Sequence, residues 1–238
     1  MSSDSRLGIV TIGQSPRVDM VPEMLPWLGI ESNRVVERGA LDGLTPQQIE
    51  RLGPADRGFD EAREEEALLT TRLADGSSVV LEHHQVVGLL AEAVRWLEDE
   101  ADVTASLVVC SSEFPPIPRL RSLLFAESLL TSGVRGIVSA DEHLGVVCPL
   151  PEQTESQDSK WRRVTAKVSS ATATPYQAAA EEPVAEAARR LAGRGATTIV
   201  LDCMGYTLAM KQAAVRAVGV PVLLAREVVA RLAGAVID

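Results

Sequence analysis

Short runs of β-branched and other apolar residues alternate with helical segments along this chain of 238 residues. A short apolar run bounded by turn residues is typical of a strand, and strands separated by helical patterns are typical of βαβ units. The alternation therefore predicts an α/β fold with parallel sheets. We predict such strands at residues 7–11, 34–37, 107–110, 136–138, 144–148, 198–203 and 220–224, with another inside 164–172.

Capping and turn signals organise the segments between these strands. Ser15 followed by Pro16 predicts the start of a helix that runs to about Leu28. Asp75-Gly76 predicts a hairpin between residues 70–73 and 78–81. Further helices are expected at 84–99, at 119–130, from 183 to 193 or 195, and from 227 onward, and the polar, acidic residues 54–66 are expected to form a connection.

The composition limits the classes of partner. The formal net charge of −10 repels nucleic acid and acidic membrane surfaces, and 3% aromatic residues offer little for base stacking. The first residues lack the apolar core of a signal peptide, and no run reaches the roughly 18 apolar residues of a membrane span. Three cysteines in such a chain are typical of reduced thiols. We therefore expect a cytoplasmic protein with no nucleic-acid or membrane partner. A small anionic molecule remains compatible because a local arginine acts at short range.

Two cysteines each follow an apolar run of strand type. Cys110 ends the run LVVC, and Cys203 ends TIVLDC. Ligands of parallel α/β sheets bind at the carboxyl ends of the strands. A pair of thiols facing each other across a cleft would provide an acid and a base on opposite faces of one carbon. The alternative is that both are small buried hydrophobes, since cysteine is often buried. Cys148 precedes Pro149 and has no partner thiol, which favours a structural or rim position.

Polar residues beside these strand ends are candidates for binding a carboxylate. The loop from Gly13 to Arg17 places free N–H groups at a predicted helix start, and an arginine there is able to clamp a carboxylate. The turn after Cys110 offers hydroxyl and N–H groups for an enolate oxygen. Helix capping, an ordinary turn or core packing are the alternatives. The candidate binding residues are Gln14, Ser15, Arg17, Ser111, Ser112, Glu113, Met204, Gly205 and Tyr206.

Several other chemistries have no supporting motif. The adjacent His83 and His84 point in different directions, and the cysteines lack metal-ligand spacing, so we predict no metal site. Gly13 stands outside any dinucleotide or Walker pattern, and no G-x-S-x-G motif is present. We therefore expect no cofactor.

Three segments together resemble the AroM family, in order along essentially the whole chain. They are TIGQSPR at residues 11–17, CSSEFP at 110–115 and LDCMGY at 201–206. AroM proteins are similar to the aspartate/glutamate racemase superfamily, which includes hydantoin racemases, maleate isomerases and arylmalonate decarboxylases. The better-known racemases carry Asn-Thr where this chain has Ser111-Ser112. Glutamate racemases carry Thr-His where it has Met204-Gly205. These departures leave the substrate open.

The resemblance implies two pseudo-symmetric parallel-sheet α/β domains of Asp/Glu racemase type, with the active site between them. It implies a first domain at residues 1–141 plus 226–238, including a returning C-terminal helix, and a second at 142–225. A homodimer is also an expectation from the superfamily.

The residues and the resemblance together predict a cofactor-independent racemase or isomerase acting on a small carboxylate-bearing molecule. Cys110 and Cys203 would exchange a proton on opposite faces of one carbon. The alternatives are a cysteine-dependent decarboxylase or cis–trans isomerase, and a non-catalytic small-molecule-binding protein, because fold alone does not specify function.

Overall fold

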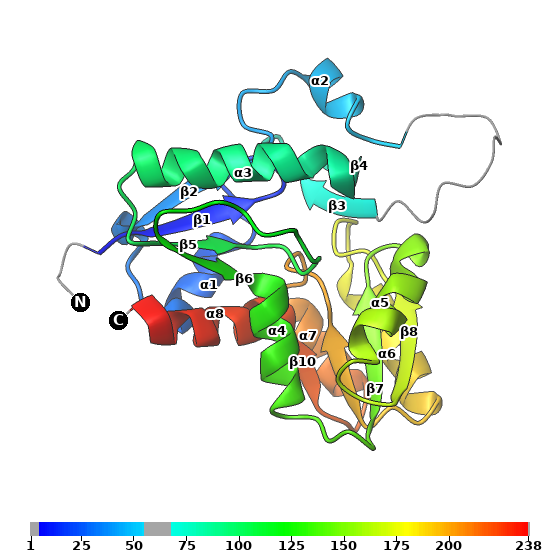
Figure 1. Cartoon of the computed structure of the whole chain (residues 1–238). Helices are drawn as coiled ribbons and strands as arrows, with labels where there is room; N and C mark the ends of the chain where they lie inside the picture. The colour runs from blue at the N-terminus through cyan, green and yellow to red at the C-terminus, as the bar shows by residue number, and fades with distance from the viewer. Residues whose placement is uncertain (1–4, 55–67, 238) are drawn as a thin grey trace.

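Two four-stranded parallel sheets form the framework of the molecule (Figure 1). The computed structural model describes residues 5–54 and 68–237. The first sheet has the order β2-β1-β5-β6 and the second β10-β9-β7-β8. The strands of the first sheet are β1 (Leu7–Thr11), β2 (Val35–Gly39), β5 (Ala105–Val108) and β6 (Ser122–Phe125); those of the second are β7 (His143–Cys148), β8 (Lys167–Thr172), β9 (Thr198–Leu201) and β10 (Val222–Leu224).

The two sheets share one topology. If the four strands of each sheet are numbered in chain order, both sheets have the spatial order 2-1-3-4. In both sheets the third strand, β5 or β9, is central. Cys110 and Cys203 each come two residues after the end of that strand, so the two thiols occupy equivalent positions. The predicted pseudo-symmetric, parallel α/β fold is confirmed.

Helices cover the faces of both sheets (Figure 1). In the first sheet, α3 packs against β1 and β2, and its buried side chains form one core with Val10 and Val108. On the other face lie α1, α4 and α8. In the second sheet, α6 and α7 pack together over Leu201, and α5 lies against β7 and β8. The helices are α1 (Val21–Leu28), α3 (His83–Asp99), α4 (Ala126–Arg135), α5 (Thr154–Trp161), α6 (Glu181–Gly193), α7 (Leu208–Ala217) and α8 (Ala225–Ile237).

One hydrophobic core connects the two sheets. Leu7 and Leu107 of the first sheet belong to the same buried cluster as Leu144 and Val200 of the second. The C-terminal helix α8 follows β10 of the second sheet and packs against α1 and α4 of the first. This is the place expected of a returning helix; the domain boundaries at residues 141 and 226 stay a prediction.

A hairpin lies outside both sheets. Its strands β3 (Leu68–Arg72) and β4 (Ser78–Glu82) are antiparallel, and Gly76 in the turn has a φ of +86° that favours glycine. The predicted hairpin is confirmed. A short helix, α2 (Pro46–Glu50), precedes it and is capped by Thr45. The predicted connection 54–66 lies, apart from residue 54, outside the described residues.

Three predicted elements differ from the structure. The helix expected from Ser15 begins only at Val21, because the Asp42 carboxylate accepts bonds from the Ser15 N–H and hydroxyl and the Glu37 carboxylate accepts the Arg17 N–H. These bonds hold residues 15–17 outside the helix.

The other two lie in the region 119–138. Of the helix expected at 119–130, residues 122–125 form strand β6, which pairs in parallel with β5, and only the part from residue 126 is helical, as the start of α4. The carboxylate of Glu98 accepts the N–H groups of Leu120 and Arg121, which holds the chain extended before β6. The strand expected at 136–138 is the last turn after α4, where the N–H of Val138 bonds to the carbonyl of Val134.

Within residues 5–54 and 68–237, no helix is both long and apolar enough to cross a membrane.

Candidate functional site

A small cavity lies where the carboxyl ends of the two sheets meet. Its volume is about 30 Å³, which leaves room for one or a few water molecules. The segments after β1, β5, β7 and β9 all reach it, and so does hairpin strand β3. The lining residues are Ile12, Arg17, Leu69, Thr70, Thr71, Val109, Cys110, Ser111, Ser112, Pro149, Gln153, Gln157, Tyr176, Asp202, Cys203 and Met204.

The two predicted thiols line this one cavity from opposite sheets. Cys110 is 8% exposed and Cys203 is half-buried, and both are free thiols. A negative charge on the Cys203 sulfur would raise the pKa of Cys110 by repulsion, in addition to the larger effect of burial, so the two sulfurs are near each other. Both side chains therefore contribute to the wall of the cavity.

Cys203 is held by two neighbours. Its Sγ accepts the N–H of Gly205 at 3.3 Å, and the hydroxyl of Tyr176 lies 3.9 Å from it. Tyr176 is positioned in turn by the guanidinium of Arg72, which lies 5.4 Å from the centre of its ring. Cys203 thus has hydrogen-bonding groups beside the sulfur.

Burial favours the protonated form of both thiols. It raises the pKa of Cys110 to about 11, although the N–H and hydroxyl of Ser112 and the charge of Lys160 act in the opposite direction. Burial also raises the pKa of Cys203, opposed by the N–H of Gly205 and the hydroxyl of Tyr176. Both thiols are therefore weaker acids in the folded protein than in an unfolded chain.

Arg17 lines the cavity, but its guanidinium is engaged. Nε and Nη2 donate to the two carboxylate oxygens of Asp19 at 2.8 and 2.9 Å. Nη1 donates to the hydroxyls of Thr11 and Thr71 at 2.9 and 3.4 Å. Burial raises the pKa of Asp19, but this hydrogen bond and charge outweigh it and lower that pKa below its usual value. A substrate carboxylate would have to compete with Asp19 for this guanidinium.

A buried polar cluster lies beside both thiols. The ammonium of Lys160 donates to the carbonyl of Ser111 at 2.8 Å and to Oδ2 of Asp202 at 2.7 Å. The indole N–H of Trp161 donates to the same Oδ2 at 2.7 Å. Ser111 follows Cys110 directly, and Asp202 directly precedes Cys203. Lys160 therefore bonds to the chain next to each thiol.

A second, larger cavity adjoins the first on the side of α5. Its volume is about 200 Å³, and it shares Ser111, Ser112 and Gln157 with the first cavity. The other lining residues are His83, Glu113, Ser156, Lys160 and Arg163. This polar cavity is the larger space next to the thiols.

The structure brings only some of the predicted binding residues to the thiol cavity. Arg17, Ser111, Ser112 and Met204 line it, and Gly205 contacts Cys203 through its N–H. The others have separate contacts. Gln14 binds Ala74 of the hairpin turn, Ser15 binds Asp42, Glu113 pairs with Arg163 in the polar cavity, and the hydroxyl of the fully buried Tyr206 donates to the carbonyl of Ala173.

Cys148 lies outside both cavities. It is fully buried, and the carbonyl oxygens of Leu150 and Ala171 both lie within hydrogen-bonding distance of its thiol. Burial raises its pKa to about 12. These contacts favour the structural position that the sequence predicts for it.

Several lining residues escaped the sequence analysis. Lys160 and Gln157 belong to α5, which the sequence presents as a polar segment without an apolar stripe. Thr71 comes from the hairpin and Tyr176 from the loop after β8. None of them belongs to a recognisable motif, so only the fold places them at the site.

In the described part of the chain, no group of three or more histidine, cysteine, aspartate or glutamate residues is arranged to hold a metal ion.

The comparisons with known proteins agree with this architecture. The model of a family described as AroM protein matches residues 7–237. The glutamate racemase from Francisella tularensis subsp. tularensis SCHU S4 in complex with D-glutamate is similar in structure, with a TM-score of 0.59 and 12% identity over 98% of this chain and 81% of that one. A comparison with curated proteins found no significant match.

Two further structures widen the range of activities found on this fold. Allantoin racemase from Pseudomonas fluorescens has a TM-score of 0.55 and 14% identity over 97% of this chain and 90% of that one. A liganded double mutant of arylmalonate decarboxylase has a TM-score of 0.58 and 10% identity over 98% and 92%. At these identities the likeness establishes an Asp/Glu racemase type of fold.

Proposed function

The chain belongs to the AroM family, and from that premise we propose that it is a cofactor-independent racemase or isomerase of a small carboxylate-bearing molecule. One observation carries the proposal: Cys110 and Cys203, at equivalent positions in the two sheets, line the same cavity. Inversion of a carbon centre needs a base on one face and an acid on the other. Two thiols from separate halves of a pseudo-symmetric molecule meet that need.

The proton balance is simple. One sulfur, as thiolate, removes the proton from the carbon next to the carboxylate and becomes a thiol. The other, as thiol, gives its proton to the opposite face and becomes a thiolate. No electrons are exchanged, and the reverse reaction restores the starting state. The two sulfurs therefore alternate as base and acid, one for each direction.

The intermediate needs hydrogen-bond donors for its enolate oxygens. Ser111 and Ser112 line the cavity directly after Cys110 and have hydroxyl groups beside it. Donors that are fixed before the reaction stabilise a developing oxyanion without reorganisation. Arg17 contributes its positive charge nearby, although Asp19 holds its guanidinium. We assign carboxylate binding first to the serine turn.

The size of the cavity supports an opening step. About 30 Å³ is too small for an acid of several heavy atoms. The adjoining polar cavity shares Ser111, Ser112 and Gln157 and is the natural approach for the substrate. Opening, binding and closure would exclude water from the intermediate, as in many enzymes that move to bind.

The decisive experiment measures exchange of the α-proton for deuterium in heavy water, by NMR, across a panel of small chiral acids. We expect one class of acid to exchange, and Cys110→Ser and Cys203→Ser each to lower that exchange by about 10² to 10⁴-fold. Cys148→Ser is the control, since this cysteine lies outside the cavity. If both variants keep full exchange while folded, the two-thiol mechanism is wrong.

A related chemistry on the same site is decarboxylation or cis–trans isomerisation by one of the thiols. It predicts that only one of the two serine variants loses activity. Release of carbon dioxide from a malonate probe, or conversion of a cis to a trans unsaturated diacid, distinguishes these reactions from racemisation.

A second class of function is ligand binding without catalysis. The observation that favours it is the raised pKa of both thiols, which leaves little thiolate at neutral pH. It predicts tight binding of an acid, measured by calorimetry, with no exchange of that acid's α-proton in heavy water. Catalysis predicts that the acid which binds also exchanges its α-proton.

A further inference from the structure

The buried Lys160 connects the two segments that carry the thiols. It lies in the last turn of α5 and belongs to neither of the strands that precede the cysteines. Its ammonium bonds to the carbonyl of Ser111 at 2.8 Å and to Oδ2 of Asp202 at 2.7 Å. One side chain thus reaches the turn after Cys110 and the residue before Cys203.

Ser111 and Asp202 also contact each other directly. The hydroxyl of Ser111 reaches the carbonyl of Asp202 only at 3.5 Å. That distance is at the limit for a hydrogen bond between oxygens, so this contact is weak. The two bonds from Lys160 are short and charge-assisted, and they are the stronger connection between the turns.

Stability alone gives a poor account of this arrangement. Lys160 is 6% exposed and Asp202 is 1% exposed, and a buried ion pair usually contributes no more stability than well-packed apolar residues of similar volume. Trp161 donates to the same Oδ2, while Oδ1 of Asp202 has no hydrogen-bond partner among the described residues. The bonds of Lys160 instead fix the position of the backbone on both sides of the cavity.

We infer that Lys160 is a positioning residue, which holds the Cys110 and Cys203 turns at the spacing that a shared substrate carbon requires. The inference rests on the proposed function for its purpose, since it assumes that the two sulfurs act on one atom. It goes beyond that function by assigning a role to a residue that touches neither sulfur in the closed site. Its geometry is testable without any substrate.

The test is a bridging reaction between the two thiols. A short bifunctional methanethiosulfonate reacts with Cys110 and Cys203, and peptide mass spectrometry separates one reagent bridging both sulfurs from two reagents bound separately. The ratio of bridged to separate product is counted only in chains modified at both cysteines. It therefore reports the spacing of the sulfurs rather than their accessibility.

We expect a high ratio in the wild-type protein and a ratio lower by roughly tenfold in Lys160→Met, because a displacement of about an ångström is costly for a reaction at fixed geometry. Lys160→Arg keeps the charge and the donors, and the polar cavity beside it has room for the guanidinium. We expect its ratio to stay within about twofold of wild type.

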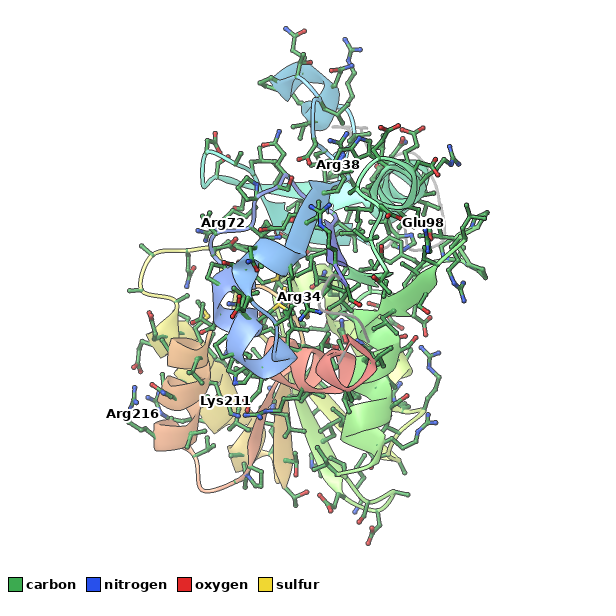
Figure 2. All side chains as sticks on the ribbon, turned by 90° about the vertical axis from the view of Figure 1, so that its left-hand side faces the viewer. Arg34, Arg38, Arg72, Glu98, Lys211 and Arg216 are labelled. Atoms are coloured by element: carbon green, nitrogen blue, oxygen red, sulfur yellow. The ribbon has the colours of Figure 1, made fainter. Side chains whose placement is uncertain are left out.

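Lys211→Met is the matched control. Lys211 also forms an ion pair, with Glu227 at 2.6 Å, but it lies on α7, and Figure 2 shows it far from Arg72 of the hairpin. Its ratio should equal that of wild type. Circular dichroism confirms that each variant is folded before its ratio is read.

Two results would overturn the inference: a Lys160→Met ratio equal to wild type, or a Lys160→Arg ratio as low as that of Lys160→Met. If Lys160→Met fails to fold with Asp202 left unpaired, the double variant Lys160→Met with Asp202→Asn removes the lone charge, and the same low ratio is expected of it. A low ratio there supports the inference, and a wild-type ratio overturns it.

The results distinguish a failure of the positioning role from a failure of the racemase proposal. A high wild-type ratio that Lys160→Met leaves unchanged ends the positioning role and leaves the racemase proposal standing. A ratio that falls as expected, together with no α-proton exchange from any acid, ends the racemase proposal and leaves the positioning role standing. A wild-type protein in which chains modified at both cysteines carry only separate reagents, with no bridged product, overturns both.

Discussion

The position of Tyr176 beside the Cys203 sulfur depends on the small size of Gly205. A Cβ atom added there would lie 2.6 Å from the hydroxyl oxygen of Tyr176 and 2.9 Å from Cγ of Pro175. Real Cβ contacts are never so short, so Tyr176 would have to move. Tyr176 is the residue whose hydroxyl lies next to the Cys203 sulfur.

We therefore expect Gly205→Ala to lower the free energy of unfolding by about 1 to 3 kcal/mol, as overpacking usually does. It should also change the rate at which iodoacetamide alkylates Cys203 by several-fold, with Cys148 unchanged. Urea unfolding and peptide mass spectrometry measure the two effects.

Gly88 provides the control. It lies in α3, where an added Cβ meets no atom within 4 Å. Gly88→Ala should raise the free energy of unfolding by about 0.5 to 1 kcal/mol through helix propensity and leave every thiol rate unchanged. Equal effects of the two substitutions on Cys203 would contradict the contact with Tyr176.

At the scale of elements, α8 connects the site to the first sheet through Arg226. This side chain is fully buried. Nε and Nη2 donate to the carbonyl of Met204 at 3.0 and 2.7 Å, and Nη1 donates to the carbonyl of Asp19 and to the carboxylate of Glu23. Arg226 thus donates hydrogen bonds both to the backbone just after Cys203 and to residues at the start of α1.

Replacing Arg226 with Met removes these bonds and leaves Glu23 without its cation. We expect the free energy of unfolding to fall by about 2 to 4 kcal/mol, because breaking a buried charge pair leaves the other charge uncompensated. Urea unfolding measures this change, and the dependence of the unfolding free energy on urea concentration should be the same in both proteins.

Arg231→Met is the comparison on the same helix. Arg231 is exposed and pairs with Glu227 on the surface. Its loss should cost no more than about 0.5 kcal/mol. A similar loss from both arginines would mean that burial of Arg226 does not matter.

The hairpin is the element that covers the thiol cavity. Thr71 lines the cavity, the side chain of Gln153 binds the carbonyl of Leu68, and Gly13 lies against the backbone of Arg72. A Cβ atom added at Gly13 would lie 2.4 Å from the carbonyl oxygen of Arg72 and 2.5 Å from Oγ1 of Thr71. The loop after β1 therefore needs glycine for the hairpin to close on it.

We expect Gly13→Ala to displace the hairpin and raise the alkylation rate of Cys110 by about tenfold or more, because local opening exposes the cavity. Gly219→Ala, where an added Cβ meets nothing within 4 Å, should leave that rate at its wild-type value. A slower or unchanged rate in Gly13→Ala would show that the hairpin does not limit access to the thiol.

For the whole molecule, the sequence predicts the repeated order of elements well, and it places the two cysteines after strands at one cavity. Both follow from local signals, namely apolar runs and turn residues. The sequence does not reveal Lys160, since lysine is rarely buried and its partners are distant in the chain. It also misplaces β6, because a four-residue apolar run is ambiguous between strand and helix until its pairing with β5 is known.

The buried thiols also predict how the stability of the whole molecule depends on pH. Burial raises the pKa of Cys110 to about 11, against about 8.5 in an unfolded chain. Below about pH 8.5 the thiol is protonated in both states, so its contribution to stability is complete. As the pH rises further, the unfolded chain loses this proton while the folded chain keeps it. Stability is therefore lost between about pH 8.5 and 11.

The loss from Cys110 alone should approach about 3 kcal/mol at the upper end of this range. Cys110→Ala lacks this titration, while every other ionisable group remains in both proteins. The difference in free energy of unfolding between wild type and Cys110→Ala, from urea unfolding, should therefore fall steadily from pH 8 to pH 10.5. A difference that stays constant over that range would mean that the thiol is not buried, and the closed cavity around it would then be wrong.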